Sequence, residues 1–174
     1  INEGDVVTAN TGWAEYAVAD PGLPTFRKLD PNGAPLSTAL GILGINGFTA
    51  YFGLLAVGQP KAGDTVLVST AAGAVGSAVG QIAKIKGCRT IGIAGGADKT
   101  ALCTDVFGFD EAIDYKAVDD LDAAIRQACP DGIDVYYDNV GGETLDIVLG
   151  QVNLHGRVVI CGTASTDAWI PQPT

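Results

Sequence analysis

The chain has 174 residues and a formal net charge of −10, with 20 Asp and Glu residues against 10 Lys and Arg residues. Because such a field repels phosphate backbones and anionic bilayers, nucleic acid and membranes are not expected as partners. The 4 cysteines are far apart in the sequence and there is 1 histidine, which argues against a metal site or a disulfide framework and favours a reduced, cytoplasmic protein.

Residues 1–35 differ in pattern from the rest of the chain. They hold short β-type runs with turn residues, then a passage rich in Pro and Gly, and no helical periodicity. We expect them to be the end of a β-rich unit, and residues 36–174 to form a second domain. Because the sequence contains no methionine, we expect both to be parts of a longer protein.

From residue 36 onward, predicted helices alternate with predicted strands. The helices are expected over 36–58, 74–86, 98–107, 119–128 and 143–151. The strands are expected over 65–70, 89–94, 111–115, 134–138 and 157–161. This alternation implies βαβ crossovers and a parallel sheet with helices on both faces. The predicted fold class is therefore α/β, a doubly wound parallel sheet of the Rossmann type.

The turn between strand 65–70 and helix 74–86 is rich in small residues. Ala71, Gly73 and Gly76 have the GxGxxG spacing, with alanine in the first position. Glycine at 73 lets the backbone approach a pyrophosphate, and free amides at the helix start favour an anion. The pattern also suits a plain tight turn, but the flanking strand and helix favour dinucleotide binding.

The end of the next strand indicates which dinucleotide to expect. A fold that binds NAD usually has Asp or Glu there, whereas residues 90–96 contain no carboxylate. Lys99 follows, where its ammonium group could meet a 2′-phosphate. Alternatively, Lys99 is a solvated surface lysine and Asp98 a helix cap. The missing acid favours NADP(H) as the cofactor.

Later polar residues have both structural and functional interpretations. Asn139 and residues 162–166 follow predicted strands, at the edge where open parallel sheets bind ligands, although both loops could be plain turns. We expect the acidic residues at 119, 120 and 122 to stabilise a helix N-terminus. His155 is expected in a surface turn between a helix and a strand.

Five segments in order carry a resemblance to a known family. They are "NGFTAYFGLL", "AAGAVGSAVGQIAKIKGC", "FGFDEAIDYK", "DGIDVYYDNVGGE" and "GRVVICGTAST". Together they resemble the zinc-independent medium-chain dehydrogenase/reductase superfamily, in the branch of prostaglandin reductases, alkenal double-bond reductases and curcumin reductases. A weaker match, "GDVV...GWAEYAV", resembles the tail of that family's GroES-like catalytic domain, so most of that domain would be absent here.

The resemblance implies an NADP(H) site and no metal. The residues implied at the pyrophosphate turn are Ala72, Gly73, Ala74, Val75 and Gly76. Those implied at the 2′-phosphate and adenosine are Lys99 and Tyr115. Those implied at the ribose and nicotinamide are Asn139, Cys161, Gly162, Thr163, Ala164, Ser165 and Thr166. Tyr51 would lie near the cleft as a candidate catalytic residue, or else fill the core as an aromatic side chain.

The activity implied by the resemblance is hydride transfer from NADPH to the β-carbon of an α,β-unsaturated ketone or aldehyde. One departure concerns the substrate: the branch often has Tyr just after the "CG-x-x-S-x" run, and this chain has Asp167. A carboxylate does not stabilise an enolate as a phenol does. A quinone reductase of the same superfamily, and a non-catalytic NADPH-binding sensor or structural subunit, therefore stay open as alternatives.

The expected partner is a small molecule, an enone, enal or quinone. A homodimer of the full-length protein is left open. The chain by itself is expected to be inactive, because the missing catalytic domain would supply one wall of the cleft.

Overall fold

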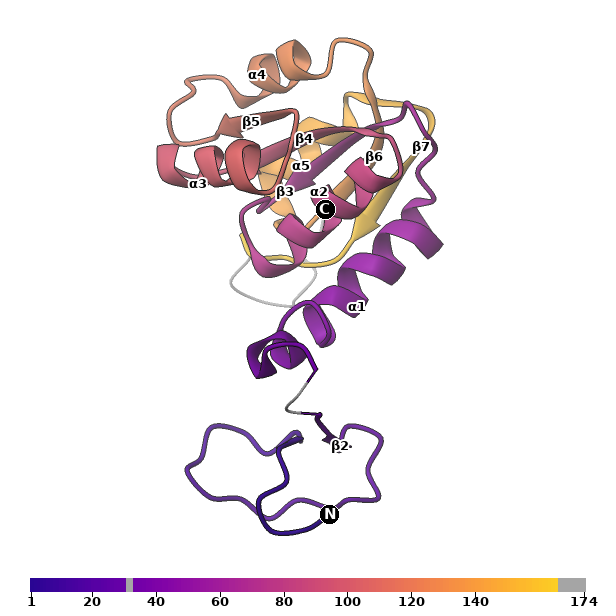
Figure 1. The fold of residues 1–174 in the computed structure, drawn as a ribbon. Helices are drawn as coiled ribbons and strands as arrows, with labels where there is room; N and C mark the ends of the chain where they lie inside the picture. Colours follow the sequence, from indigo (N-terminus) through magenta and orange to yellow (C-terminus); the bar gives the residue numbers. More distant parts are fainter. Residues whose placement is uncertain (31–32, 166–174) are drawn as a thin grey trace, which may run out of the picture.

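A five-stranded parallel sheet with helices on both faces forms the larger part of the molecule (Figure 1). The computed structural model describes residues 1–30 and 33–165. The strands are β3 (Thr65–Ser69), β4 (Arg89–Ala94), β5 (Glu111–Asp114), β6 (Ile133–Asp138) and β7 (Val152–Ile160). Their order is β5-β4-β3-β6-β7, so the chain winds outward from β3 on one side and then on the other. This order confirms the predicted doubly wound fold.

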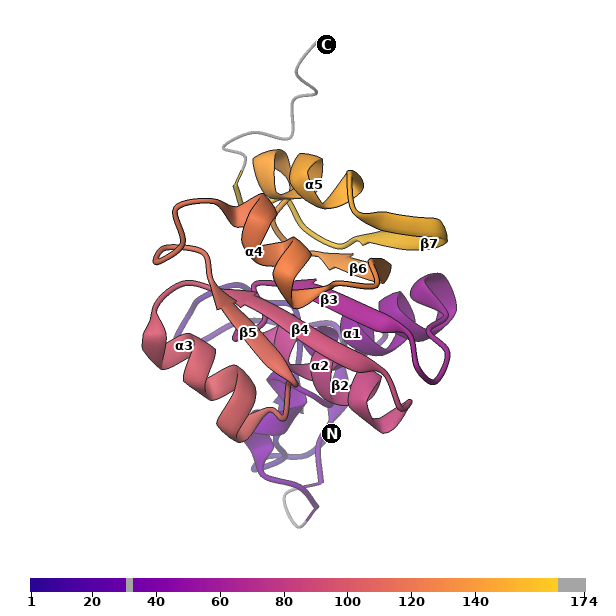
Figure 2. The ribbon, with the colours of Figure 1, turned by 90° about the horizontal axis from the view of Figure 1, so that it is seen from above.

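Each face of the sheet has its own apolar core. Val66 and Val68 of β3 belong to one cluster and Leu67 to the other, because successive strand residues point to opposite faces. Helices α1 (Ile45–Phe52) and α2 (Ala74–Ile85) cover the first face, and α4 (Leu121–Ala128) and α5 (Gly142–Leu149) cover the second (Figure 2). The β-branched runs of the strands thus form the two cores.

The single helix predicted over 36–58 is wrong. The structure has a 3-10 helix, η1 (Leu36–Leu40), then a turn, then α1, which continues as a π-helix, η2 (Gly53–Gly58). Glycines at 41 and 44 interrupt the run, and Gly44 has extended dihedral angles as the N-cap of α1. The helix predicted over 98–107 also changes type, from α3 (Ala97–Ala101) to the π-helix η3 (Leu102–Val106).

Strand β7 begins earlier than predicted and includes His155, which we expected in a turn. His155 has a φ of 68°, and the pairing of β6 with β7 shifts register between Ile133 and Val135. An irregularity of this kind lets a strand continue through a residue with left-handed dihedral angles. His155 is exposed on this strand.

The N-terminal segment lies apart from the large sheet (Figure 1). It holds two short antiparallel strands, β1 (Val7–Thr8) and β2 (Arg27–Lys28). Lys28 forms an ion pair with Asp5, at 2.6 Å between Nζ and Oδ1. The side chain of Arg27 donates to the carbonyl oxygen of Leu43 at 3.4 Å, which links the segment to the turn before α1. The domain boundary after residue 35 stays a prediction.

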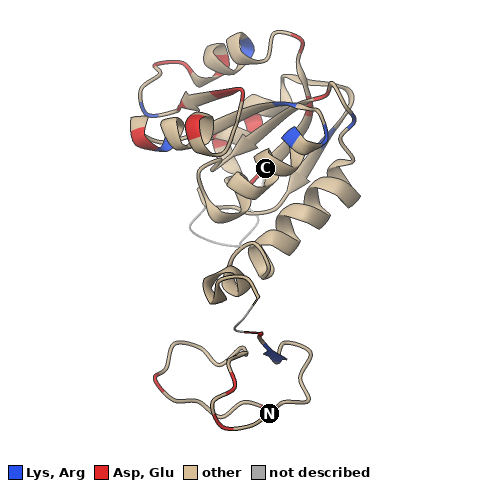
Figure 3. Ribbon diagram, in the orientation of Figure 1, with Lys and Arg blue, Asp and Glu red and all other residues tan. Residues whose placement is uncertain are grey.

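Helix α1 and the π-helix η2 contain no charged residue (Figure 3). They also expose large apolar side chains, among them Ile45, Phe52 and Val57, which are 73%, 59% and 55% exposed. None of the helices in the described part of the chain is long and apolar enough to cross a membrane. This helical segment is therefore an apolar surface on an acidic molecule.

Candidate functional site

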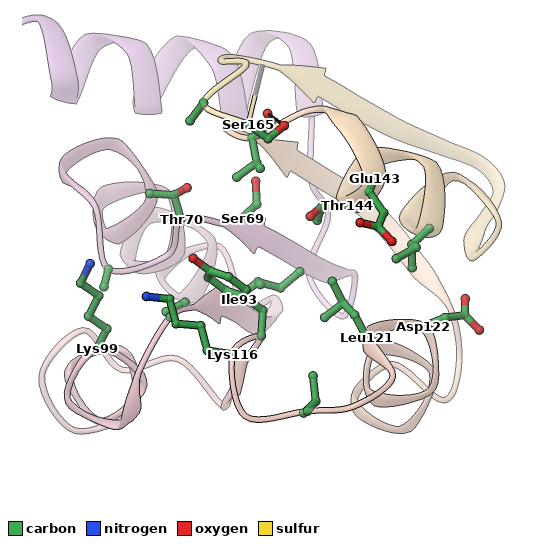
Figure 4. Close-up of a pocket in the computed structure, with 18 of the residues that line it drawn as sticks. Ser69, Thr70, Ile93, Lys99, Lys116, Leu121, Asp122, Glu143, Thr144 and Ser165 are labelled. Atoms are coloured by element: carbon green, nitrogen blue, oxygen red, sulfur yellow. Dashed lines mark hydrogen bonds between the residues drawn. The ribbon is translucent and has the colours of Figure 1, made fainter. Parts of the chain in front are cut away.

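A pocket of about 850 Å³ opens at the carboxyl ends of the parallel strands (Figure 4). The predicted cofactor residues that line it are Ala72, Gly73, Lys99, Tyr115, Ala164 and Ser165. Those outside its lining are Ala74, Val75, Gly76, Asn139, Cys161, Gly162 and Thr163. Thr166 lies outside the described residues, as does Asp167. The pocket therefore collects residues from every loop that the sequence singled out.

The turn between β3 and α2 forms one wall of the pocket. Thr70 has a φ of 52°, and the N–H of Gly73 donates to its carbonyl oxygen at 2.8 Å. Gly73 is the N-cap of α2 and supplies no side-chain hydrogen bond. Because the first amides of a helix have no intrahelical acceptor, the start of α2 can donate to an anion. Gly76 is buried within α2, so its role is in packing.

The loops after β4 and β5 form the second wall. Lys99 of α3 and Tyr115 after β5 both line the pocket, and their roles at the 2′-phosphate and adenosine stay predictions. Tyr115 packs over Gly95, where an added Cβ would lie 2.7 Å from its ring. Lys116 also lines this wall, although the sequence analysis did not single it out. Lys116 reaches this wall because β5 pairs with β4 in the sheet, and that pairing is a tertiary contact that the local sequence pattern does not show.

A buried carboxylate fixes the loop after β6. Asp138 is fully buried, and its Oδ1 accepts hydrogen bonds from the backbone N–H groups of Val140 and Gly141, both at 3.0 Å. The hydroxyl of Tyr136 donates to the same oxygen at 2.8 Å, and burial raises the pKa of Tyr136, which keeps it protonated. The other oxygen, Oδ2, accepts no hydrogen bond from the described residues.

The same network joins the ends of β3 and β6. The hydroxyl of Ser69 donates to Asp138 at 3.3 Å and accepts from the N–H of Asn139 at 2.8 Å. The side-chain amide of Asn139 donates to the carbonyl oxygen of Ser69 at 2.7 Å. Ser69 and Val140 line the pocket, whereas Asn139 does not line it but is hydrogen-bonded to Ser69, which does. The two central loops are therefore held as one rigid unit.

The chain after β7 packs on this unit. The N–H groups of Cys161 and Gly162 donate to the backbone carbonyl of Asp138 at 2.8 and 3.1 Å. Further along, Ser165 makes two hydrogen bonds to the carbonyl oxygen of Val140, one from its Oγ at 2.7 Å and one from its backbone N–H at 3.0 Å. These bonds bring Ser165 into the pocket lining.

Tyr51 lies on α1 and does not line the pocket. It is 52% exposed and meets Phe52 edge to face, with 5.3 Å between the ring centroids. The alternative of a core aromatic is therefore wrong. A catalytic role for Tyr51 stays a prediction.

One wall of the pocket is acidic, which the sequence did not predict. Asp119, Asp120, Asp122 and Glu143 all line it. Asp120 is the N-cap of α4 and accepts from the N–H of Ala123 at 3.0 Å, as expected for its place in the sequence. Hydrogen bonding to Arg126 lowers the pKa of Asp122. A helix N-terminus role accounted for Asp119, Asp120 and Asp122 in the sequence, and nothing there marked them or Glu143 as pocket residues.

No metal centre is formed within residues 1–30 and 33–165. No three His, Cys, Asp or Glu side chains meet there as metal ligands. Burial raises the pKa of Cys129 to about 11, so that cysteine is an uncharged core residue at neutral pH.

A protein family matches the second half of the chain. It is described as zinc-binding dehydrogenase, and it matches residues 74–173, which begin with the first residue of α2. The match therefore covers most of the sheet and the pocket.

Two curated proteins match nearly the whole chain. A putative NADP-dependent oxidoreductase, YfmJ of Bacillus subtilis (strain 168), is 53% identical over 95% of this chain and 48% of its own length. The NADP(+)-dependent 2-alkenal reductase of Nicotiana tabacum is 49% identical over 94% of this chain and 47% of its own length. The chain thus spans about half the length of these relatives.

A solved structure agrees in fold as well as in sequence. CurA from Vibrio vulnificus in complex with NADPH is 46% identical and superposes with a TM-score of 0.88. The likeness covers 98% of this chain and 51% of CurA.

Proposed function

Because the chain belongs to the zinc-independent branch of the medium-chain dehydrogenase/reductase superfamily, we propose that it is the nucleotide-binding part of an NADPH-dependent reductase of enones and enals. One observation carries the proposal. The pocket at the carboxyl ends of the strands adjoins the uncapped start of α2, the end of β4 has no acid where NAD-binding folds usually have one, and Lys99 of α3 lines the pocket just beyond it.

The residues around the pocket fit NADP(H). A volume of about 850 Å³ lies within the usual range of cofactor sites. The amides that start α2 suit the pyrophosphate, and Lys99 suits the 2′-phosphate. The loop fixed by Asp138 and the residues 161–165 would lie along the ribose and nicotinamide. The relatives named for NADP and the NADPH complex of CurA support this assignment.

The chain's own contribution is to bind and orient. When bound, NADPH supplies a hydride for the β-carbon of the enone, and the resulting enolate then takes a proton from a donor or from water. The backbone amides of α2 and Lys99 hold the anionic groups in place. The rigid loop after β6 fixes the position of the nicotinamide side, which favours a near-attack geometry.

The test is a turnover assay with the full-length protein. We expect NADPH oxidation with simple enones and enals and none with the matched saturated ketones, because a saturated ketone has no electrophilic β-carbon to accept the hydride in the proposed reaction. NADH should be a poorer donor. Binding of NADPH without oxidation by any member of a broad panel would instead support the non-catalytic sensor or subunit. Oxidation by quinones alone would support the quinone reductase.

A second test concerns the cofactor preference. Calorimetry on the full-length Lys99→Ala variant should show weaker binding of NADPH and little change for NADH, because only NADPH has the 2′-phosphate. Equal losses for both nucleotides would refute the role of Lys99.

A further inference from the structure

Two lysines from different elements line the pocket beside the end of β4. The backbone N–H of Lys99 donates to the carbonyl oxygen of Gly96 at 3.0 Å, so the first turn of α3 is tied to this point. The side chain of Lys116 comes from the loop after β5 and lies against Gly95, where an added Cβ would be 3.0 Å from its Cε. Both side chains line the same pocket (Figure 4).

Asp114 holds this arrangement in place. Its Oδ1 accepts from the backbone N–H of Gly96 at 2.8 Å and from the backbone N–H of Lys116 at 3.0 Å. One carboxylate oxygen therefore joins the loop after β4 to the loop after β5. The position of Lys116 relative to Gly96 is fixed before any ligand arrives.

Neither lysine has an acidic partner among the described residues. The ion pairs there involve Lys28, Lys84, Arg89 and Arg126. On the acidic wall, Asp122 is paired with Arg126 at 2.7 Å, and Figure 4 shows Asp122 and Glu143 at the far side from both lysines. The ammonium groups of both lysines are therefore available to an anionic ligand at this end of the pocket, although Asp119 and Asp120 also line the pocket.

From these contacts we infer that Lys116 is a second phosphate-binding residue, which acts with Lys99 on the 2′-phosphate of the cofactor and sets the preference for NADPH over NADH. The inference rests on the proposed function. A phosphate monoester carries a charge of about −1.5 to −2 at neutral pH, so a single lysine leaves part of that charge uncompensated. Lys116 supplies the missing charge, and Gly95 leaves room for its side chain.

Lys116 also lies 6.0 Å from the centroid of the Tyr115 ring. This contact orients the side chain but does not depend on a phosphate. A role confined to it would affect NADPH and NADH alike, whereas a phosphate contact affects NADPH alone. The ratio of the two affinities separates the two roles.

The experiment measures equilibrium binding of NADPH, NADH and adenosine 2′-monophosphate to the full-length protein by calorimetry. We expect Lys116→Ala to weaken NADPH and adenosine 2′-monophosphate about tenfold and to leave NADH within about twofold. Lys116→Arg should retain most of the affinity, because the charge remains. Lys86→Ala is the matched control, since it removes the same charge at the other end of α2, and should change none of the three.

Added salt provides a second measurement. In the wild type, the ratio of NADPH affinity to NADH affinity should fall as the ionic strength rises, because salt screens the contacts between the lysines and the 2′-phosphate. The ratio should fall less in Lys116→Ala, because that variant has already lost one of these contacts. Equal losses for NADPH and NADH in Lys116→Ala, or no loss for either, would overturn the inference while the proposed function stands. A wild-type protein that binds neither nucleotide would overturn the proposed function, and the role of Lys116 with it.

Discussion

Asp138 accepts hydrogen bonds from several groups that hold the loop after β6 beside the pocket. Replacing it with alanine would leave the N–H groups of Val140 and Gly141 and the hydroxyl of Tyr136 without their acceptor. We expect Asp138→Ala to lower the free energy of unfolding by about 2–4 kcal/mol, because buried donors without a partner are costly. Urea unfolding followed by circular dichroism measures this.

Two variants control that experiment. Asp138→Asn keeps an acceptor oxygen and should lose less. Asp131→Ala removes an exposed side chain and should change stability by no more than about 0.5 kcal/mol. A loss in Asp138→Ala no larger than in Asp131→Ala would show that the buried network contributes nothing to stability.

At this scale, the sequence predicted residues whose role follows from local pattern. The small residues at 72 and 73 and Lys99 line the pocket because they lie in the turn after β3 and in the first helix after β4. Lys116 and Glu143 could not be identified in that way, because their position depends on which strands and helices are neighbours. The role of Asp138 was missed for another reason, since a carboxylate at a strand end gives no sign of its buried donors.

At the scale of elements, Asp110 joins α2 to β4. Its Oδ1 pairs with Lys84 of α2 at 2.7 Å, and its Oδ2 accepts from the backbone N–H of Thr90 in β4 at 2.8 Å. Partial burial opposes the charged form of Asp110, but the hydrogen bonds from Lys84 and Thr90 outweigh it and hold its pKa below the ordinary value.

This lowered pKa predicts an acid-dependent stability. A carboxyl group whose pKa is lower in the folded state stabilises the fold above its unfolded pKa of about 3.9, and that contribution is lost as the pH falls through the folded pKa. We expect Asp110→Asn to lose about 1 kcal/mol near neutral pH, and the difference from wild type to shrink at acidic pH. Urea unfolding over a pH series tests this, with Glu3→Gln as an exposed control. A pH-independent difference would contradict it.

The packing of α2 on β4 depends on a second feature, the ring of Phe109. An added Cβ at Gly80 of α2 would lie 2.1 Å from that ring, and one at Gly92 of β4 would lie 3.3 Å from it. We expect Gly80→Ala to destabilise the protein by about 1–3 kcal/mol despite its better helix propensity. Thermal unfolding measures the change.

The control for this variant is Gln81→Ala, at the neighbouring exposed position of the same helix. Phe109→Leu in the Gly80→Ala background should recover part of the loss, since a smaller side chain leaves room for the methyl group. Gly80→Ala as stable as Gln81→Ala would mean that the ring moves aside freely.

Elements were predicted best where the residue pattern decides them. The strand over 89–94 agrees residue by residue, because its apolar run is bounded by turns. The helix over 36–58 failed, because the pattern of apolar residues does not show where a glycine pair breaks a helix or where hydrogen bonding changes to the π type. Strand β7 begins before the predicted residue 157, because the register shift in its pairing with β6 lets the strand continue through the positive φ of His155.

At the scale of the whole molecule, α1 and η2 expose an uncharged apolar surface, which the proposed catalytic domain of the full-length protein would cover. We expect the isolated 174-residue chain to bind NADPH but not to oxidise it with enones, because the proposed catalytic domain would complete the cleft and exclude water. Side-by-side assays of the chain and the full-length protein test this, with bound NADPH measured in both. Comparable turnover by the two would contradict it.

The winding order of the sheet has a kinetic consequence. β3, β4 and β5 pair across short connections, whereas the bond between Ser69 and Asp138 joins residues 69 positions apart. Because closing a longer loop costs more entropy, we expect the β3–β5 half to form first on refolding and β6 to dock later. Asp138→Ala should then accelerate unfolding far more than it slows refolding, which would mark the junction of the two halves as a late event on the folding pathway.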